Sequence, residues 1–320
     1  MPVSAKAECF MTSRDKPLRV ALLGARGIGQ VHARIFHALG AEICAVLGSS
    51  QESAADATRM LKDSFGIDAK PLSQIDSLLD MARPDAMSIC TPPQFHFAEI
   101  VAAFDHDIPV FCEKPIFWHE GIQRSELEKN LEYLNRHPKR RFFINTSNAN
   151  FIDRVIEEIG EQNNIHSFSF LFYTQGRYVG RNIGLDLLPH GISLLLRLFD
   201  PMKIDDLRED IKEHTYGCRF RYGNCTVEFD FQELPDGPKE FAFEINGRRL
   251  TRIQEGEGPT YRVYLKDSHT GGTIETPDPF RLYITRFLNY CNHGAHVRED
   301  DFNDAAANLR LMADILLGGS

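Results

Sequence analysis

The sequence lacks the features that mark secreted, membrane-spanning or nucleic-acid-binding proteins. None of its apolar runs approaches the ~20 residues needed to span a bilayer. Basic residues are not in excess, because 36 Lys and Arg against 45 Asp and Glu leave a formal net charge of −9. That balance provides no broad electrostatic footprint for nucleic acid or for an anionic membrane. Residues 1–16 mix charges of both signs without an apolar core, so we expect a flexible tail there and no secretory signal.

The seven cysteines form no CxxC pair, and their number is odd. Cys44, Cys90 and Cys112 lie inside predicted buried strands, which suits reduced thiols that act as small hydrophobic residues. The cytoplasm is therefore the expected compartment. His293 and His296 follow a helix without carboxylate or thiol partners at a suitable spacing, so we expect no metal site.

Apolar runs and amphipathic helices alternate through the first half of the chain. Strands are predicted at 18–23, 43–47, 86–90, 108–112 and 142–145, and helices at 28–39, 51–65, 74–82 and 94–105. This alternation implies βαβ units and hence a parallel sheet that is covered by helices on both faces. Ligands of such sheets lie at the carboxyl ends of the strands, where all the motifs of this half are found.

A glycine-rich turn follows the first strand and reads Gly24-Ala25-Arg26-Gly27-Ile28-Gly29. Gly24 and Gly29 occupy the outer places of the G-x-G-x-x-G pattern, while Arg26 replaces the middle glycine. The N-terminus of the following helix can still receive a phosphate, and the Arg26 guanidinium can bind phosphate oxygens. The alternative is an ordinary strand–helix turn without a ligand. Together with the βαβ pattern, the turn predicts a dinucleotide-binding Rossmann domain over residues 17–147.

The end of the second predicted strand bears on the type of dinucleotide. An acidic residue at this place normally holds the ribose hydroxyls of NAD, but here the chain reads Gly48-Ser49-Ser50. Without a carboxylate, nothing repels a 2′-phosphate, and Ser49, Ser50 and Arg26 are able to bind one. The pattern therefore favours NADP over NAD. Alternatively, the serines simply cap the helix that begins near residue 51.

Two further segments stand at strand ends, Cys90-Thr91-Pro92-Pro93-Gln94-Phe95-His96 and Cys112-Glu113-Lys114-Pro115. An ammonium at the carboxyl end of a strand can lower the pKa of a substrate hydroxyl or polarise a carbonyl, and Glu113 would keep Lys114 charged. Pro115 sets the direction of the turn and is a candidate for a cis peptide bond. The alternatives are a solvated surface lysine in an ion pair and, for His96, a packing role.

At this spacing, the Thr-Pro-Pro and Glu-Lys-Pro segments resemble the Gfo/Idh/MocA family, the glucose–fructose oxidoreductase and inositol dehydrogenase group of NAD(P)-dependent enzymes. The resemblance extends from Arg19 to about Leu317 and is weaker after the second segment. It implies that the Thr-Pro segment lines the nicotinamide ribose and that the lysine contacts ribose and substrate oxygen. Carried over, these roles belong to Thr91, Pro92, His96, Glu113, Lys114 and Pro115.

The pattern changes in the second half, which we predict to be an α+β domain over residues 148–320. Helices are predicted at 151–161, 187–199 and within 280–317, and strands at 165–173, 214–232, 240–253 and 260–266. Hairpin turns at 222–224 and 246–247 indicate a large open sheet that is mainly antiparallel. Its broad face could pack against a copy of itself, and the resemblance also implies a homodimer or homotetramer.

Asp186 and His190 are four positions apart, so on a helix they share one face. A carboxylate that holds one imidazole nitrogen raises the basicity of the other, as a general base requires. The resemblance implies a catalytic Asp-x-x-x-His pair, often with glycine between and a further aspartate three positions on. Leu188 and Ser193 depart from that pattern. The alternative is that Asp186 caps a helix with Pro189 in its first turn.

A polar, cationic and aromatic segment leads into this pair. It could bind substrate hydroxyls or an anionic group through Tyr173, Arg177, Tyr178, Arg181 and Asn182. The alternative is an exposed loop without a ligand.

These patterns predict an NAD(P)-dependent dehydrogenase or reductase that transfers a hydride between nicotinamide and a hydroxyl or carbonyl carbon of a sugar, sugar derivative or cyclitol. In this hypothesis His190 removes the hydroxyl proton, Asp186 orients the His190 ring, and Lys114 stabilises the alkoxide. Two other functions stay open: a non-catalytic NAD(P)-binding sensor or assembly subunit, and reduction of an imine or ketone on a larger precursor. The expected partner is a small molecule, with no nucleic acid and no membrane.

Overall fold

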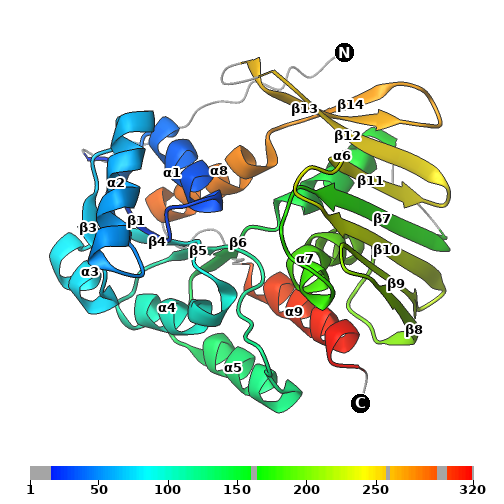
Figure 1. Cartoon of the computed structure of the whole chain (residues 1–320), viewed down its shortest axis with the longest axis horizontal. Coiled ribbons are helices and arrows are strands. Elements are labelled where there is room, and N and C mark those ends of the chain that lie inside the picture. The colour runs from blue at the N-terminus through cyan, green and yellow to red at the C-terminus, as the bar shows by residue number, and fades with distance from the viewer. Residues whose placement is uncertain (1–15, 160–163, 257–259, 294–300, 319–320) are drawn as a thin grey trace.

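The computed structural model describes residues 16–159, 164–256, 260–293 and 301–318. Two open sheets stand side by side, with helices between them and on the far face of the first sheet (Figure 1). The predicted tail falls almost entirely outside the described residues. No helix within the described ranges has both the length and the apolar character needed to cross a bilayer.

The first sheet is parallel throughout and has the order β3-β2-β1-β4-β5-β6. Its elements are β1 (Arg19–Leu23), α1 (Ile28–Ala38), β2 (Glu42–Leu47), α2 (Gln51–Phe65), β3 (Lys70–Leu72), α3 (Ile75–Ala82), β4 (Ala86–Ile89), α4 (Pro93–Asp105), β5 (Val110–Cys112), α5 (Arg124–Arg136) and β6 (Phe142–Ile144). The strand order reverses direction between β1 and β4, which creates the crevice where ligands of such sheets bind. The predicted Rossmann architecture is confirmed, with β3 and α5 added to the elements we expected.

The second sheet has eight strands in the order β14-β13-β12-β11-β7-β10-β9-β8. They are β7 (Ser167–Thr174), β8 (Ile204–Ile211), β9 (Thr215–Tyr222), β10 (Cys225–Glu233), β11 (Glu240–Ile245), β12 (Arg248–Glu255), β13 (Arg262–Asp267) and β14 (Thr273–Thr276). All neighbours pair antiparallel except β7 and β10, which run parallel. The mainly antiparallel sheet is therefore confirmed.

Two helical elements, η1 (Ser147–Ala149) and α6 (Asn150–Ile159), connect the two sheets, and α7 (Arg181–Leu198) follows β7 within the second domain. Helix α7 begins six residues earlier than we expected, and its N-cap is Gly180. Asp186 therefore lies inside the helix, and the alternative that it caps the helix is wrong. Because α7 is continuous through Pro189, Asp186 and His190 do share one helical face.

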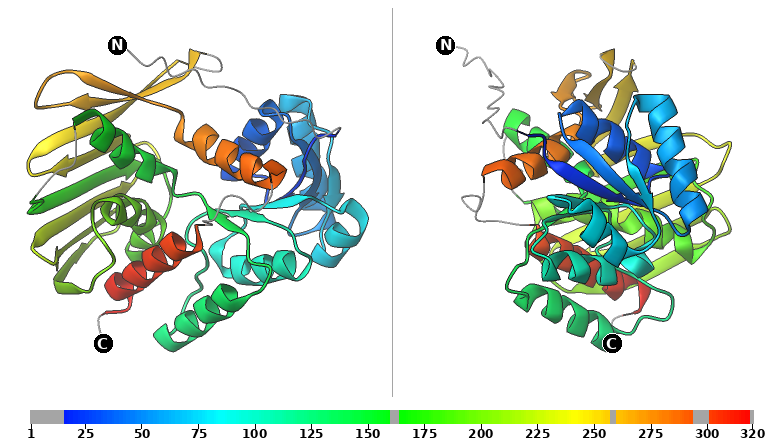
Figure 2. Two further views of the ribbon diagram at one scale, coloured as in Figure 1. Left: turned by 180° about the vertical axis from the view of Figure 1, so that it is seen from behind. Right: turned by 90° about the vertical axis from the view of Figure 1, so that its left-hand side faces the viewer.

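Aromatic side chains on the inner face of the second sheet build its core. Phe170 and Phe172 of β7, Phe229 and Phe231 of β10, and Phe241 of β11 pack edge to face or offset, with ring centroids 4.9–6.3 Å apart. They share one face because side chains alternate along a strand. Helices α6 and α7 cover this face, and Figure 2 shows the opposite face free of helices.

The chain then returns to the first sheet. Helix α8 (Pro279–His293) lies against α1, and its buried Phe287 packs against Phe36, Phe111 and Phe143. Burial of one such ring contributes roughly 1.5–3 kcal/mol. Helix α9 (Phe302–Leu316) packs against α7 (Figure 2). The expected boundary at residue 147 thus separates the two sheets, but α8 shares the core of the first one.

Candidate active site

The motif segments of the first half meet at one edge of the parallel sheet. The Cys90 N–H donates to the Leu23 carbonyl at 2.7 Å, and the Glu113 N–H donates to the Ile89 carbonyl at 2.9 Å. The glycine turn after β1, the Thr-Pro segment after β4 and the Glu-Lys-Pro segment after β5 are therefore neighbours. This edge is the carboxyl side of the strands, as the sequence predicted.

The two outer glycines of the turn leave no room for side chains. A Cβ on Gly24 would lie 2.8 Å from the Cys90 carbonyl oxygen, and one on Gly29 would lie 2.1 Å from the Gly24 oxygen. Gly27 has a φ of 55° and directly precedes α1. Backbone is thus exposed at a helix N-terminus, the geometry that receives a pyrophosphate, and Arg26 is exposed at the tip of the turn.

The two serines after β2 differ in their surroundings. Ser50 is the N-cap of α2, and its hydroxyl oxygen accepts the Ser53 N–H at 3.0 Å. The capping alternative is therefore confirmed for Ser50. Ser49 is exposed and makes no side-chain hydrogen bond within the described residues.

Lys114 and Asp186 join the two halves of the molecule. The Lys114 ammonium donates to Asp186 Oδ1 at 2.7 Å and to the Asp186 carbonyl at 2.8 Å. Only 12% of the Lys114 side chain is exposed. Burial opposes both charges, but their mutual attraction outweighs it, so the pKa of Lys114 is raised and that of Asp186 is lowered. The Lys114–Pro115 peptide bond is cis, the conformation for which the sequence made Pro115 a candidate.

His190 lies one turn of α7 beyond Asp186, but its partner is a different residue. Nδ1 of His190 is 2.9 Å from the Asn148 amide nitrogen, and Phe172 packs its ring edge-to-face at 5.3 Å. The expected hydrogen bond between the His190 imidazole and the Asp186 carboxylate does not form, because Lys114 binds that carboxylate. Burial, together with the charge of Lys114, lowers the pKa of His190 to about 3. The ring is therefore neutral, and with Asn148 donating to Nδ1 its hydrogen is on Nε2.

Glu113 faces away from Lys114 into the interior of the first domain. Its Oε1 is 2.8 Å from His32 Nε2 and also accepts the Asn145 amide. Burial opposes a charge on His32, but its contacts with Cys90 and Glu113 outweigh burial and raise the pKa of His32 to about 10. Glu113 is correspondingly held below its usual pKa range despite burial. This buried ion pair fixes the backbone from which Lys114 projects.

His96 links two of the predicted cofactor segments without being exposed to a ligand. It is fully buried, and its ring nitrogens lie 2.7 Å from the Thr91 carbonyl and 2.9 Å from the Pro115 carbonyl. The Thr91 hydroxyl donates to Glu99, and Pro92 is the N-cap of α4. These contacts support the packing alternative for His96, so we no longer assign it a cofactor contact.

The polar segment before α7 contributes less than we expected. Tyr173 lies on the outer face of its strand, opposite Phe172, and its hydroxyl donates to Asp230 at 2.7 Å. Arg181 binds Glu209 and the Leu316 carbonyl. These positions correct the expectation that both face a substrate. Arg177, Tyr178 and Asn182 are exposed.

The two departures from the expected Asp-x-x-x-His pattern lie inside the helix packing. Leu188 is fully buried, and the Ser193 hydroxyl donates to the His190 carbonyl at 2.7 Å. Neither brings a further polar group toward Lys114.

Sequence reasoning missed Asn148, His32 and Glu233. Glu233 is fully buried beside the Lys114–Asp186 pair, and the pKa effects of the three groups on one another show their proximity. Its signal was present in the sequence, because Glu233 continues the inward phase of β10 set by Phe229 and Phe231. Asn148 belongs to a polar run after β6 that we had interpreted only as a change of pattern.

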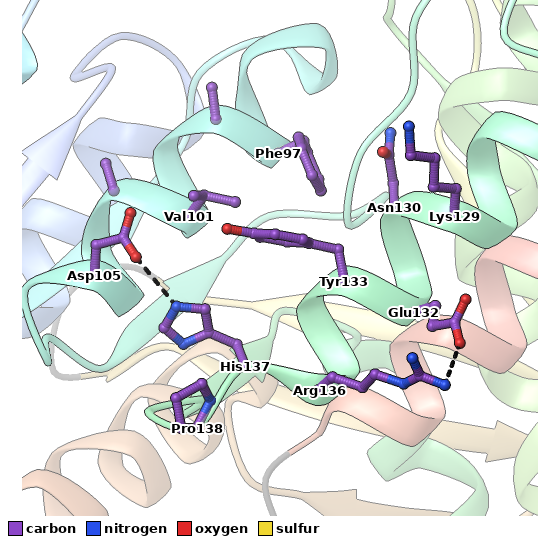
Figure 3. A pocket seen from close by; sticks show the side chains of 12 residues that line it. Phe97, Val101, Asp105, Lys129, Asn130, Glu132, Tyr133, Arg136, His137 and Pro138 are labelled. Carbon is purple, nitrogen blue, oxygen red and sulfur yellow. Dashed lines mark hydrogen bonds and ion pairs between the residues drawn. The ribbon is translucent and has the colours of Figure 1, made fainter.

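A large cavity lies elsewhere in the described residues. It measures about 980 Å³ and lies between α4 and α5, where Phe97 and Tyr133 face each other (Figure 3). His137 in its wall pairs with Asp105, and Arg136 pairs with Glu132. Its lining residues do not include Lys114, Asp186 or His190.

Within the described ranges, no group of three or more His, Cys, Asp or Glu side chains could hold a metal ion. The side chains of His293 and His296 lie outside the described residues.

Residues 18–145 match the oxidoreductase family with an NAD-binding Rossmann fold known as Gfo/Idh/MocA. This match covers the first domain of the chain. Inositol 2-dehydrogenase of Corynebacterium glutamicum is 32% identical over 122 residues, which is 37% of this chain and 35% of that protein. D-glucoside 3-dehydrogenase of Escherichia coli is 33% identical over 107 residues, or 33% of this chain and 28% of that protein. The matches thus span about a third of the length of these curated relatives.

Solved structures extend the similarity to the second sheet. Myo-inositol 2-dehydrogenase from Lactobacillus plantarum superposes with a TM-score of 0.70 at 17% identity, covering 94% of this chain and 97% of that one. A 3-ketoreductase from Actinomadura kijaniata, in complex with NADP and TDP-benzene, gives 0.69 at 18% identity, with 95% and 98% covered. At these identities, the likeness establishes a shared fold.

The charges of the His32 and His190 imidazoles can be measured directly. We expect nitrogen-15 NMR to show His32 doubly protonated from about pH 5 to pH 8, because its pKa is raised to about 10. His190 should stay neutral over the same range, with its hydrogen on Nε2, because its pKa is lowered to about 3. H32N and H190N variants assign the signals. A neutral His32 or a charged His190 at pH 6 would contradict the electrostatics described above.

Proposed function

We propose that the protein is an NAD(P)-dependent oxidoreductase that interconverts a hydroxyl and a carbonyl group on a sugar, sugar derivative or cyclitol. The observation that carries the proposal is the ion pair of Lys114 with Asp186, which places a buried ammonium from the Rossmann edge against α7 and one turn from His190. The relatives, an inositol 2-dehydrogenase and a D-glucoside 3-dehydrogenase, support the substrate class.

The residues of the first domain fit a dinucleotide. The glycine turn at Gly24 and Gly29 would hold the pyrophosphate at the start of α1, and Thr91 and Pro92 would lie along the nicotinamide half. When bound, the nicotinamide supplies or accepts the hydride. Lys114 would then face the substrate oxygen, where its charge stabilises an alkoxide or polarises a carbonyl.

His190 would hold the substrate oxygen beside Lys114. As a neutral ring with its hydrogen on Nε2, it donates a hydrogen bond to that oxygen. If the Asn148 amide turned by half a revolution, its oxygen would accept from Nδ1, and Nε2 would become a proton acceptor. Asn148 therefore takes the orienting role that we had assigned to Asp186.

NADP remains the favoured cofactor in this proposal. There is no carboxylate directly after β2, Ser49 is exposed there, and Arg26 is exposed at the glycine turn. Ser50 contributes less to the argument than we expected, because its hydroxyl caps α2. The A. kijaniata ketoreductase of the same fold was solved with NADP.

We expect Lys114→Ala to lower kcat by about 10²–10³, the usual loss when one donor to a developing oxyanion is removed. Fluorescence titration should show that the variant still binds NADPH. Lys129→Ala, at an exposed lysine of α5, is the control and should behave as wild type. Stopped assays with a polyol, aldose and sugar-acid panel measure turnover. Dinucleotide binding without turnover of any panel member by the wild type would favour the sensor alternative.

For the cofactor, we expect calorimetric titration to give tighter binding of NADPH than of NADH. Arg26→Ala should weaken NADPH binding by about 1.5–3 kcal/mol, the usual worth of a hydrogen bond to a charged group, and affect NADH less. Arg34→Ala, an exposed arginine of α1, is the matched control. Equal affinities for the two dinucleotides in the wild type would remove the argument from Arg26 and Ser49.

We also propose that the outer face of the second sheet mediates self-association, because no helix of the described residues covers it (Figure 2). This face carries exposed ion pairs such as Arg219–Glu228. Sedimentation velocity should give a dimer or tetramer, and a monomer at micromolar concentration would exclude this interface. The thiols of Cys44, Cys90, Cys112, Cys218 and Cys225 are free, which supports our expectation of a reducing compartment, the cytoplasm.

A further inference from the structure

Glu233 is an ionisable residue on the buried face of β10, where apolar residues are expected. It is the last residue of β10, and its inward direction follows that of Phe229 and Phe231 along the strand. It is completely buried. Carboxylates are almost never fully buried unless they are paired, so its partners decide what it does.

The hydrogen bonds of the Glu233 carboxyl are incomplete. Oε2 accepts the Tyr178 N–H at 2.9 Å, whereas Oε1 has no partner that meets hydrogen-bond geometry among the described residues. The loop before α7 closes tightly over the group, because a Cβ on Gly176 would lie 1.9 Å from Oε2. A single backbone donor is poor compensation for a buried carboxylate.

The charged groups that face Glu233 are Asp186 from α7 and Lys114 from the segment after β5. Both hydrogen bonds of the Lys114 ammonium go to Asp186, so Glu233 has no cation of its own. From the residue before β9, His214 contributes its carbonyl, which accepts the Glu233 N–H at 3.1 Å. Two carboxyls thus share one ammonium, and when like charges share a buried site, one of them keeps its proton.

We propose that Glu233 is a positioning residue of the active site, a carboxylic acid that shares its proton with Asp186 and thereby keeps the Lys114–Asp186 pair electrically neutral. The inference rests on the proposed function for its catalytic meaning, but the protonation itself does not depend on turnover. Protonated Glu233 has an O–H on the side of the unpartnered oxygen, which can donate to the Asp186 carboxylate. Asp186 then stays fixed against Lys114.

The direction of the pH dependence follows from the burial of Glu233. Burial, followed by the neighbouring Asp186, raises the pKa of Glu233 to about 7, while the Tyr178 N–H and Lys114 oppose the rise. Below that pH the group is neutral, and above it a second negative charge appears beside Asp186. Because substrate oxidation builds negative charge on the oxygen near Lys114, the extra charge should slow it at higher pH.

The kinetic test compares wild type with Glu233→Gln, which keeps an acceptor for the Tyr178 N–H and a donor toward Asp186 but cannot ionise. We expect the ratio of kcat/KM for oxidation, variant over wild type, to rise several-fold from about pH 6 to about pH 8.5. Glu228→Gln, at an exposed position of the same strand, should give a constant ratio near one. A constant ratio for Glu233→Gln would overturn the proposal.

A second measurement needs no substrate, and therefore separates this proposal from the proposed function. Carbon-13 NMR of glutamate carboxyls should show Glu233 titrating near neutral pH, with its midpoint lowered in Asp186→Asn because a neighbouring negative charge is removed. The Glu99 carboxyl, whose pKa is also raised to about 7 by burial, is not perturbed by Asp186 and should keep its midpoint. If no glutamate midpoint responds to Asp186→Asn, or if Glu233 titrates near ~4.3, the shared proton does not exist.

Discussion

The ion pair between Lys114 and Asp186 holds the two halves of the site together. The Lys114 side chain is largely removed from water, and a buried charge whose partner is lost typically costs 3–5 kcal/mol. The pair therefore defines the distance between the edge of the parallel sheet and helix α7. His190 and Asn148 take their places relative to it, since one is on α7 and the other on the connection that leads there. The acid/base geometry of the molecule is a consequence of this contact.

A second buried ion pair, between Glu113 and His32, supports the pair between Lys114 and Asp186. Glu113 and Lys114 are adjacent in the chain, yet Glu113 contacts His32 on α1 while Lys114 reaches Asp186 on α7. Side chains of neighbouring residues in an extended segment point in opposite directions, so one short motif can bind two separate elements. Helix α1 also carries the glycine turn at its N-terminus. Helix α1 therefore holds both the expected dinucleotide site, at its N-terminus, and the segment that carries Lys114, through the Glu113–His32 pair.

Much of the site could be predicted because its parts are local in sequence. The turn at Gly24 and Gly29 and the lysine at the end of a strand each carry their chemistry within a few residues. Asp186 and His190 also lie one helical turn apart, as their spacing indicated, but the bond expected between them does not form. A full ammonium competes for the same carboxylate, and a charge-assisted bond is stronger than one to a neutral imidazole. Tyr173 was predicted to bind substrate, but it lies on the outer face of β7 and its hydroxyl donates to Asp230, because side chains alternate along the strand and Phe172 points inward.

The sequence by itself determined the two sheet types, the glycine turn and the residue types at strand ends, because periodicity and backbone sterics act over short distances. Only the tertiary structure decided which partner each buried charge has. Asn148 reaches His190, and Glu233 comes to lie beside Asp186, through contacts between elements far apart in the chain. The reason is physical: the ionisation of a buried group depends on every charge and donor around it, and folding alone brings those together.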